Sequence, residues 1–486
     1  MYKITLLPSG KIIRGQEGDN LLSLLRRHGL APDAPCGGSG TCGKCRVVIA
    51  GKEIRACGIS IHGDLTVTVP GQGHLHILSP EKQLSPSDRI QEVCAAVDIG
   101  TTSVVCCLID FNTGTKCAVS STANPQAAFG ADVVSRIRSA LSGKMIALTR
   151  GIRECVSSLI LKCCECIGIS PDAVKTICIV GNPAMQQLFM GVRPDNLVQI
   201  PFFPVLTSAT AVPVKDYVPI LPNAQLMVVP NISGYVGADT IGCITATEMH
   251  RGRDMMLMVD IGTNGEMVLG NAEHMAACAT AAGPALEGAN IRFGMRACAG
   301  AIDHVWLEDG EIRYSTIADA EPLGICGSGL IDAVAAFLNL GKINSRGRID
   351  PGEEMDGERI LRLTESVYLT QEDIRQVQLA KGAIQAGIRL LMEQVGISFH
   401  EIDRVLLAGA FGTFLNPENA CRIGLLPPEL LGKIESVGNA ALEGACRMAL
   451  DFAAFRQTEV LAGQVEYVEL ASHPRFSKTF AAAMRF

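Results

Sequence analysis

The first 78 positions carry short runs in which apolar and polar residues alternate, a period typical of strands with one buried face. Two such runs flank the turn Pro8-Ser9-Gly10 and predict a hairpin. Four leucines after Asn20 form one apolar helical face, and Asn20 itself is a good N-terminal cap. The predicted elements are strands over residues 2–7, 11–14, 44–50 and 65–69 and a helix over 20–28. We therefore expect a small β-rich module over 1–78.

From residue 93 onward, short apolar strands alternate with longer helical stretches, which is typical of an α/β fold. The expected strands lie over 93–97, 103–109, 175–180, 255–259, 266–269 and 405–408, and the expected helices over 131–143, 150–168, 330–340, 371–395 and 440–455. A hairpin followed by α/β units occurs twice, so we expect two similar lobes in one domain over 93–486. The approximate bounds are 93–250 and 251–440 for the lobes and 441–486 for a C-terminal segment. The polar stretch 79–92, with two prolines, is interpreted as a linker.

Composition narrows the class of protein. With 48% apolar and 19% charged residues the chain can bury a core, which excludes a disordered protein. We find neither an apolar run long enough to cross a bilayer nor a secretion signal. Nineteen cysteines without such a signal indicate a reducing cytoplasm and metal or redox chemistry for some of them. The net charge of −7 is not the basic footprint of a nucleic-acid binder, so we expect neither nucleic acid nor membrane as a partner.

Charge is unevenly distributed along the chain. Residues 1–80 hold nine lysines and arginines against five acidic residues, a net charge of +4, whereas the remainder carries −11. One hypothesis is that the basic module docks on an acidic surface of a partner. The alternative is an ordinary solvated basic face.

A glycine-rich loop gathers three cysteines, and a fourth follows in the next turn of the module. The four are Cys36, Cys42, Cys45 and Cys57, in the spacing C-x5-C-x2-C-x11-C. Four thiolates can hold a [2Fe–2S] cluster, and the plant-type ferredoxin spacing is one residue shorter at the first gap. The alternatives are free thiols or structural zinc, although zinc ribbons generally use two separate cysteine pairs. We interpret the loop as a cluster site.

A second cysteine-rich stretch, over 155–166, holds Cys155, Cys163, Cys164 and Cys166. On a predicted helix these thiols cannot all face one ion, and no other ligands lie nearby in the sequence. We interpret them as small buried apolar residues.

Two matching hairpin turns begin with an aspartate at a strand end. They are Asp98-Ile99-Gly100-Thr101-Thr102 and Asp260-Ile261-Gly262-Thr263-Asn264-Gly265, which lie 162 residues apart. Turn N–H groups and threonine hydroxyls can cradle phosphates. An aspartate at each strand end can hold Mg²⁺, directly or through water. One such turn is weak evidence for a nucleotide site. Two copies in matching strand contexts predict two lobes that clamp one nucleotide.

A third segment follows the strand over 405–408. Its residues are Gly409, Ala410, Phe411 and Gly412, where a strand–glycine–helix turn lets the backbone approach a flat ring or a ribose. In order after the two hairpins, this segment resembles the adenosine motif of the sugar kinase, Hsp70 and actin superfamily, known as ASKHA.

Several further residues are candidates for the same site. Glu266 could orient water or Mg²⁺, and Asn182 could position an attacking water, although each also suits an ordinary strand or turn position. Gly283 and Glu287, like Asp239, lie in glycine-flanked segments that could line the cleft. Gly327 and Ser328 open a predicted helix whose free N–H groups could meet a phosphate, or they could simply allow close helix packing.

The joint pattern resembles the reductive activators of corrinoid proteins over essentially the whole chain. Besides the cysteine loop and the hairpins, the motifs are IVGNPAM at 179–185, GADT at 237–240, AGPALEG at 282–288, GICGSGLID at 324–332 and VGNAA at 437–441. The resemblance implies an α+β ferredoxin-like β-grasp domain with a [2Fe–2S] cluster, followed by a two-lobed α/β ASKHA domain of the ribonuclease H-like type that binds ATP and Mg²⁺. It implies ATP-dependent electron delivery that returns an inactive Co(II) corrinoid to Co(I).

The same resemblance implies a corrinoid protein or corrinoid-dependent methyltransferase as the partner, an upstream low-potential electron donor, and a homodimer as one candidate assembly. Family members carry extra linker and middle segments, and we expect a short version here, because about fifteen residues separate the two domains. Three alternatives stay open: activation of a non-corrinoid metalloenzyme, an ATP-binding redox sensor, and a small-molecule kinase with a regulatory cluster.

Overall fold

The computed structural model describes residues 1–7, 10–28, 30–32, 38, 40, 45–69, 91–355 and 357–486. In the N-terminal module, five strands form one sheet in the order β2-β1-β5-β3-β4, with β1 and β5 parallel. The strands are β1 (Tyr2–Leu7), β2 (Ile12–Gly15), β3 (Arg46–Ile49), β4 (Lys52–Arg55) and β5 (Leu65–Thr68), and the helix is α1 (Leu21–Arg27). Asn20 caps α1 by accepting a hydrogen bond from the Ser23 N–H, and the four leucines of α1 are buried, as predicted. The fold class predicted for this module is confirmed.

The first lobe is built on a six-stranded sheet in the order β10-β11-β9-β6-β7-β8. Its strands are β6 (Val93–Ile99), β7 (Ser103–Asp110), β8 (Lys116–Ala123), β9 (Val174–Gly181), β10 (Thr210–Pro213) and β11 (Gln225–Val228). Its helices are α2 (Val133–Ser139), α3 (Met145–Ile167), α4 (Pro183–Met190) and α5 (Ala238–Thr247). Strands β6, β7 and β8 form an antiparallel meander, and β9 runs parallel to β6 on the other side.

The second lobe has a six-stranded sheet in the order β22-β21-β12-β13-β14-β23, of which the first five strands repeat β11-β9-β6-β7-β8 of the first lobe. Its strands are β12 (Met256–Ile261), β13 (Gly265–Gly270), β14 (Met275–Thr280), β21 (Arg404–Ala408), β22 (Ile434–Gly438) and β23 (Val465–Tyr467). Again three strands form a meander, and β21 runs parallel to β12. The predicted pair of similar α/β lobes is therefore confirmed, and both aspartate turns join the first two strands of a meander.

The second lobe also carries two small sheets that no sequence pattern predicted. They comprise β15 (Ala301–Glu308), β16 (Glu311–Thr316) and β17 (Gly324–Ile325), and β18 (Glu353–Met355), β19 (Glu358–Arg362) and β20 (Tyr368–Thr370). The remaining helices are α6 (Gly327–Asn339), α7 (Gln371–Val395), α8 (Gly409–Phe414), α9 (Pro417–Arg422), α10 (Ala440–Leu450), α11 (Phe452–Gln464) and α12 (Phe476–Ala483).

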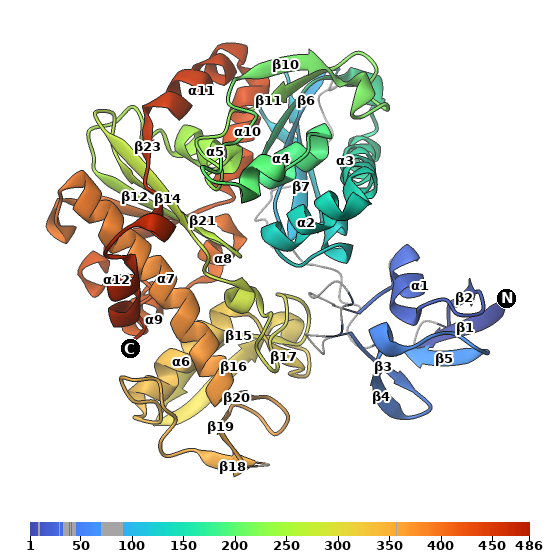
Figure 1. Cartoon of the computed structure of the whole chain (residues 1–486), viewed down its shortest axis with the longest axis vertical. Helices are drawn as coiled ribbons and strands as arrows, with labels where there is room; N and C mark the ends of the chain where they lie inside the picture. Colours follow the sequence, from blue (N-terminus) through green and yellow to red (C-terminus); the bar gives the residue numbers. More distant parts are fainter. Residues whose placement is uncertain are drawn as a thin grey trace.

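The two large sheets share a core that encloses α5 and α10 (Figure 1). Residues from both sheets belong to this core, among them Ala96 of β6 and Met258 of β12. Although α10 comes late in the chain, it packs against β6 and β9 of the first lobe as well as against α5. A helix contributed by the end of the chain thus helps to join the lobes.

Two predicted helices are divided in the structure. The helix predicted over 440–455 is instead α10 and α11, because Asp451 has extended backbone and its side chain accepts hydrogen bonds from the N–H groups of Ala453 and Ala454. The helix predicted over 131–143 ends as α2 at Ser139, and Gly143 then adopts a left-handed φ of 91°. Helix α3 starts five residues before the predicted position. Within the described residues, no helix is both long and apolar enough to cross a lipid bilayer.

Candidate functional site

The first aspartate turn is held by residues of three neighbouring elements. Asp98 lies near the end of β6, and an added Cβ at Gly100 would lie 2.9 Å from the Ser103 carbonyl oxygen, so the tight turn favours glycine. Asn182, which caps α4, donates from Nδ2 to Thr101 Oγ1 at 3.1 Å. Arg136, fully buried, donates from Nη2 to the Thr101 carbonyl at 2.5 Å. The conformation of this turn is therefore held by side chains from other elements of the first lobe.

The second aspartate turn lies between β12 and β13, where Asp260 and Glu266 face each other across the strand pair. The Gly262 N–H donates to the Asn264 carbonyl at 2.9 Å and closes the turn. The Gly283 N–H donates to the Thr263 carbonyl at 3.0 Å, which ties the loop after β14 to this turn. Gly262 and Gly283, both predicted as site residues, thus lie at this turn.

The segment resembling an adenosine motif meets the second turn directly. Gly409 follows β21 with a φ of 83°, and an added Cβ there would lie 2.6 Å from Asp260 Oδ1. Gly412 packs against the backbone of Leu407, and Ala410 and Phe411 lie between these glycines in α8. The structure therefore places the segment 409–412 beside the carboxylate of Asp260, which belongs to the second aspartate turn.

Four carboxyl groups gather where the lobes meet: Asp98, Asp239, Asp260 and Glu266. Burial raises the pKa of Asp98 to about 6. Burial, with the charge of Asp98 added, raises the pKa of Asp260 to about 7. The pKa of Asp239 rises to about 7 and that of Glu266 rises well above its usual range, again through burial first and the neighbouring carboxylates second. Oxygen donors that repel one another in this way suit a hard divalent cation such as Mg²⁺.

The region between the two aspartate turns is called the cleft below, and two of its residues were missed or left open by the sequence reasoning. Asn439 donates from Nδ2 to Asp98 Oδ2 at 2.9 Å across 341 positions of sequence, and its own Oδ1 caps α10. Asp239, which was weighed only as one candidate among several, lies in the first turn of α5 within the carboxyl cluster. A signal for Asn439 existed: the strand–Gly–Asn–helix pattern occurs both at Asn182 and at Asn439.

Glu287 connects the two aspartate turns. Its Oε2 accepts a hydrogen bond from Thr102 Oγ1 at 2.5 Å, and its Oε1 accepts one from Thr263 Oγ1 at 2.9 Å. Thr102 belongs to the turn of the first lobe and Thr263 to that of the second. Four predicted site residues, Asp98, Asp260, Glu266 and Glu287, are thus brought together at one cleft.

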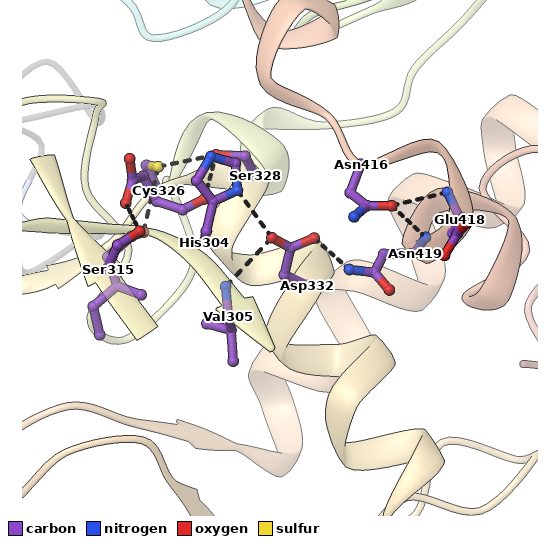
Figure 2. A network of polar contacts seen from close by, with 11 residues as sticks. His304, Val305, Ser315, Cys326, Ser328, Asp332, Asn416, Glu418 and Asn419 are labelled. Carbon is purple, nitrogen blue, oxygen red and sulfur yellow. Dashed lines mark hydrogen bonds and ion pairs between the residues drawn. The ribbon is translucent and has the colours of Figure 1, made fainter. Parts of the chain in front are cut away.

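The start of α6 lies beside the same region. An added Cβ at Gly327 would lie 1.9 Å from the Leu286 carbonyl oxygen and 2.5 Å from Phe411 Cε2, which explains glycine at this position. Figure 2 shows Ser328 among polar neighbours, and its Oγ donates to the Asp303 carbonyl at 2.8 Å. Because the hydroxyl is engaged there, a phosphate contact at this helix would depend on backbone N–H groups, and it stays a prediction.

Two of the four predicted cluster ligands lie in the described residues. Cys45 is buried, and the Cys57 N–H donates to Cys45 Sγ at 3.5 Å. Arg55 Nη1 donates to the Gly40 carbonyl at 2.9 Å, which holds a described part of the loop. Cys36 and Cys42 lie outside the described residues. A buried sulfur that accepts a backbone N–H fits an iron–sulfur ligand, whose potential such hydrogen bonds tune.

Comparisons with known proteins match these parts in order. Residues 4–66 match the 2Fe-2S iron-sulfur cluster binding domain, residues 93–252 the RACo middle region, and residues 254–486 the C-terminal domain of RACo, the ASKHA domain. The expectation that the family's middle segment is absent is therefore wrong: its counterpart is the first α/β lobe. The α/β domain predicted over 93–486 is thus matched by two family models, one for each lobe, and this is why no separate middle segment was recognised in the sequence.

Named relatives agree with these matches. The chain is 35% identical to the corrinoid activation enzyme RamQ of Eubacterium limosum over 79% of this chain and 69% of the relative. It is 27% identical to the [Co(II) methylated amine-specific corrinoid protein] reductase of Methanosarcina barkeri, over 73% of this chain and 69% of that protein. A solved structure, a reductive activator for a corrinoid, iron-sulfur protein, superposes with a TM-score of 0.74 at 28% identity, covering 100% of this chain and 98% of that one. The chain belongs to the family of reductive activators of corrinoid proteins.

Proposed function

We propose that this protein is an ATP-dependent reductive activator that returns an inactive Co(II) corrinoid protein to Co(I). The observation that carries the proposal is the convergence of Asp98, Asp260 and Gly409, from three distant segments, in a chain that also has a ferredoxin-type domain. The names of the relatives, a corrinoid activation enzyme and a Co(II) corrinoid protein reductase, support the same chemistry.

The N-terminal domain is proposed to hold a [2Fe–2S] cluster through Cys36, Cys42, Cys45 and Cys57. When bound, such a cluster supplies one low-potential electron at a time. The chain's own contribution is to exclude water from Cys45 and to donate the Cys57 N–H to its sulfur. An upstream low-potential donor is part of this proposal, and the cysteine-rich composition supports a reducing, cytoplasmic setting.

The cleft is proposed to bind ATP with Mg²⁺. Asp98 and Asp260 would hold the ion directly or through water, the two threonine-bearing turns would cradle phosphates, and the segment 409–412 would approach the adenosine. Glu266 faces Asp260 and lies where it could orient a water. Asn182, through Thr101, fixes the first turn and is therefore a positioning residue here.

ATP can assist an uphill electron transfer only if it binds two conformers of the protein unequally. For a one-electron step, each 59 mV uphill costs about a factor of ten in the equilibrium constant. Two lobes that share α10 and meet at one nucleotide site provide such conformers. We propose that closure of the lobes on ATP favours a state of the corrinoid partner that accepts the electron. A homodimer is a further candidate feature of this assembly.

The test is anaerobic optical spectroscopy of a purified Co(II) corrinoid protein mixed with this protein and a reductant, with or without ATP. The Co(I) absorption should grow only with ATP. Asp260→Asn should keep the absorption of the cluster but lose ATP-driven formation of Co(I), whereas Asp309→Asn, at an exposed turn, should behave like the wild type. Equal Co(I) formation without ATP, or by Asp260→Asn, would contradict the proposal.

A further inference from the structure

Glu287 is held on the second lobe by its backbone. It ends a short 3₁₀ turn, Pro284–Glu287, whose neighbours are α6 and α7. Gly288 follows with a φ of 80°, and an added Cβ there would lie 2.6 Å from the Met295 carbonyl oxygen. The Gly288 N–H donates to the Ala285 carbonyl at 3.0 Å. The turn is therefore packed on both sides. The backbone of Glu287 is held in place, and its side chain extends into the cleft.

The carboxylate of Glu287 spans the two lobes. One oxygen accepts from Thr102 of the first lobe at 2.5 Å, and the other accepts from Thr263 of the second lobe at 2.9 Å. The three residues are separated by 185 and 24 positions along the chain. A single side chain thus links both turns that are proposed to cradle phosphates.

A phosphate held by the threonine hydroxyls of both turns, besides the turn N–H groups, would need the same two donors. A threonine hydroxyl has one hydrogen to donate, so Thr102 and Thr263 cannot serve the Glu287 carboxylate and a phosphate oxygen at once. The two anions also repel each other at short range. Full engagement of the phosphates therefore requires Glu287 to release at least one hydroxyl.

One buried cation would face either anion in such an exchange. Arg136 is fully buried beneath the first turn, where it donates to the Thr101 carbonyl. Burial lowers the pKa of Arg136 to about 10, and the charges of Asp132 and Glu287 partly oppose this effect. A phosphate that replaced Glu287 would offer the same cation another anion. The positive charge would stay compensated while the anion changed.

We propose that Glu287 is a clasp across the cleft that competes with nucleotide phosphates for Thr102 and Thr263. This inference rests on the proposed nucleotide site and assigns Glu287 a role opposite to that of a ligand: it opposes phosphate binding, and its release from the hydroxyls lets the two turns close on the phosphates instead. Phosphate-bearing nucleotides would open the clasp, whereas adenosine alone would leave it closed.

The test compares Glu287→Gln with the wild type by calorimetry of ATP, ADP and adenosine binding to the full chain with Mg²⁺ present. The amide keeps the shape but loses the charge, so ATP and ADP should bind about fivefold more tightly, given that hydrogen bonds to charged groups are stronger by roughly 1 kcal/mol. Adenosine affinity should not change. Glu287→Ala, which removes both acceptors, should shift ATP and ADP in the same direction, and unfolding curves check that each variant is folded.

Three results would overturn the clasp in different ways. If the wild type binds ATP and ADP but neither variant binds them more tightly, Glu287 does not compete, and the proposed function stands. A large loss of ATP affinity in both folded variants would make Glu287 a ligand of the nucleotide or its cation. If the folded wild type binds no nucleotide at all, the clasp and the proposed function fail together.

Discussion

At the scale of a single residue, the buried carboxyl group of Asp260 lowers the stability of the folded protein at neutral pH. Burial and the neighbouring Asp98 raise the pKa of Asp260 to about 7, whereas an aspartate in the unfolded chain has a pKa near 3.8. Between these values the folded protein holds more protons than the unfolded chain, so its stability falls as the pH rises through this window. A cluster of buried carboxyl groups thus weakens the fold that carries it.

Asp260→Asn should therefore be more stable than the wild type at pH 8, by up to about 4 kcal/mol, since the pKa differs by about three units and each unit is worth about 1.4 kcal/mol. The difference should shrink as the pH falls and should be small near pH 4, close to the unfolded pKa of 3.8, where the folded carboxyl is protonated and the unfolded one is about half protonated. Urea unfolding at pH 4, 6 and 8 measures this. Asp309→Asn, on an exposed turn, serves as the control and should match the wild type throughout. A variant that is less stable than the wild type at pH 8 would mean that Asp260 has a stabilising partner.

At this scale, local motifs predicted only part of the cleft. Asp98 and Asp260 could be predicted to share a site because each stands in the same strand–turn–strand pattern. Arg136 could not, because its place is set by a contact with Thr101, 35 positions away, and such a contact leaves no periodic or motif signal in one sequence. Asn439 was missed although it stands in the same strand–Gly–Asn–helix pattern as Asn182.

At the scale of elements, a buried carboxylate ties three of them together in the second lobe. Asp332 of α6 accepts from the Val305 N–H of β15 at 3.3 Å and from Asn419 Nδ2 of α9 at 2.7 Å (Figure 2). His304 Nδ1 lies 3.3 Å from the same carboxylate, and this hydrogen bond raises the pKa of His304. The network holds the small sheet and α9 against the helix that begins at Gly327.

Asp332→Asn should lower the free energy of unfolding by roughly 1–3 kcal/mol, because its amide N–H groups would face other donors inside a buried site. The loss should be somewhat larger at pH 6 than at pH 8. A raised histidine pKa adds stability below the unfolded value near 6.5, and that stability is lost as the pH rises through the folded value. Exposure of His304 keeps this pH effect small. Urea unfolding of Asp332→Asn and of His304→Gln at both pH values separates the effect of the buried hydrogen bonds from that of the histidine charge. If Asp332→Asn loses no stability at either pH, Asp332 does not hold these elements together.

The elements predicted best were those whose own sequence carries a clear apolar periodicity and a recognisable cap. Helix α7 has the bounds read from the sequence, since a long apolar stripe follows a capping box made by Thr370 and Asp373. The break at Asp451 was missed because apolar periodicity continues across it, although an aspartate is a common cap. The strands β17 to β20 have only two to five residues, and their pairing partners rather than their own composition make them strands. The longer pair β15 and β16 was missed as well.

At the scale of the whole molecule, α10 connects the lobes through close backbone contact. An added Cβ at Gly444 would lie 2.0 Å from the Gly242 carbonyl oxygen of α5, and one at Gly242 would lie 2.7 Å from the Ala441 carbonyl oxygen. The same helix begins at Asn439, which holds Asp98. Packing between the sheets and the geometry of the cleft therefore depend on one helix pair, a dependence that neither lobe's sequence reveals alone.

Gly444→Ala should push α10 away from α5 and so disturb the joint between the lobes. Overpacking of this kind typically costs roughly 1–3 kcal/mol, and ATP should bind more weakly because Asn439 and Asp98 lose their alignment. Gly463→Ala is the matched control: it lies in α11 with no atom within 4 Å of the added Cβ, so it should leave ATP binding unchanged and stability equal or slightly higher. Urea unfolding and ATP calorimetry on both variants measure the two effects. Loss of stability without loss of ATP affinity in Gly444→Ala would show that α10 supports the core but does not set the position of Asp98.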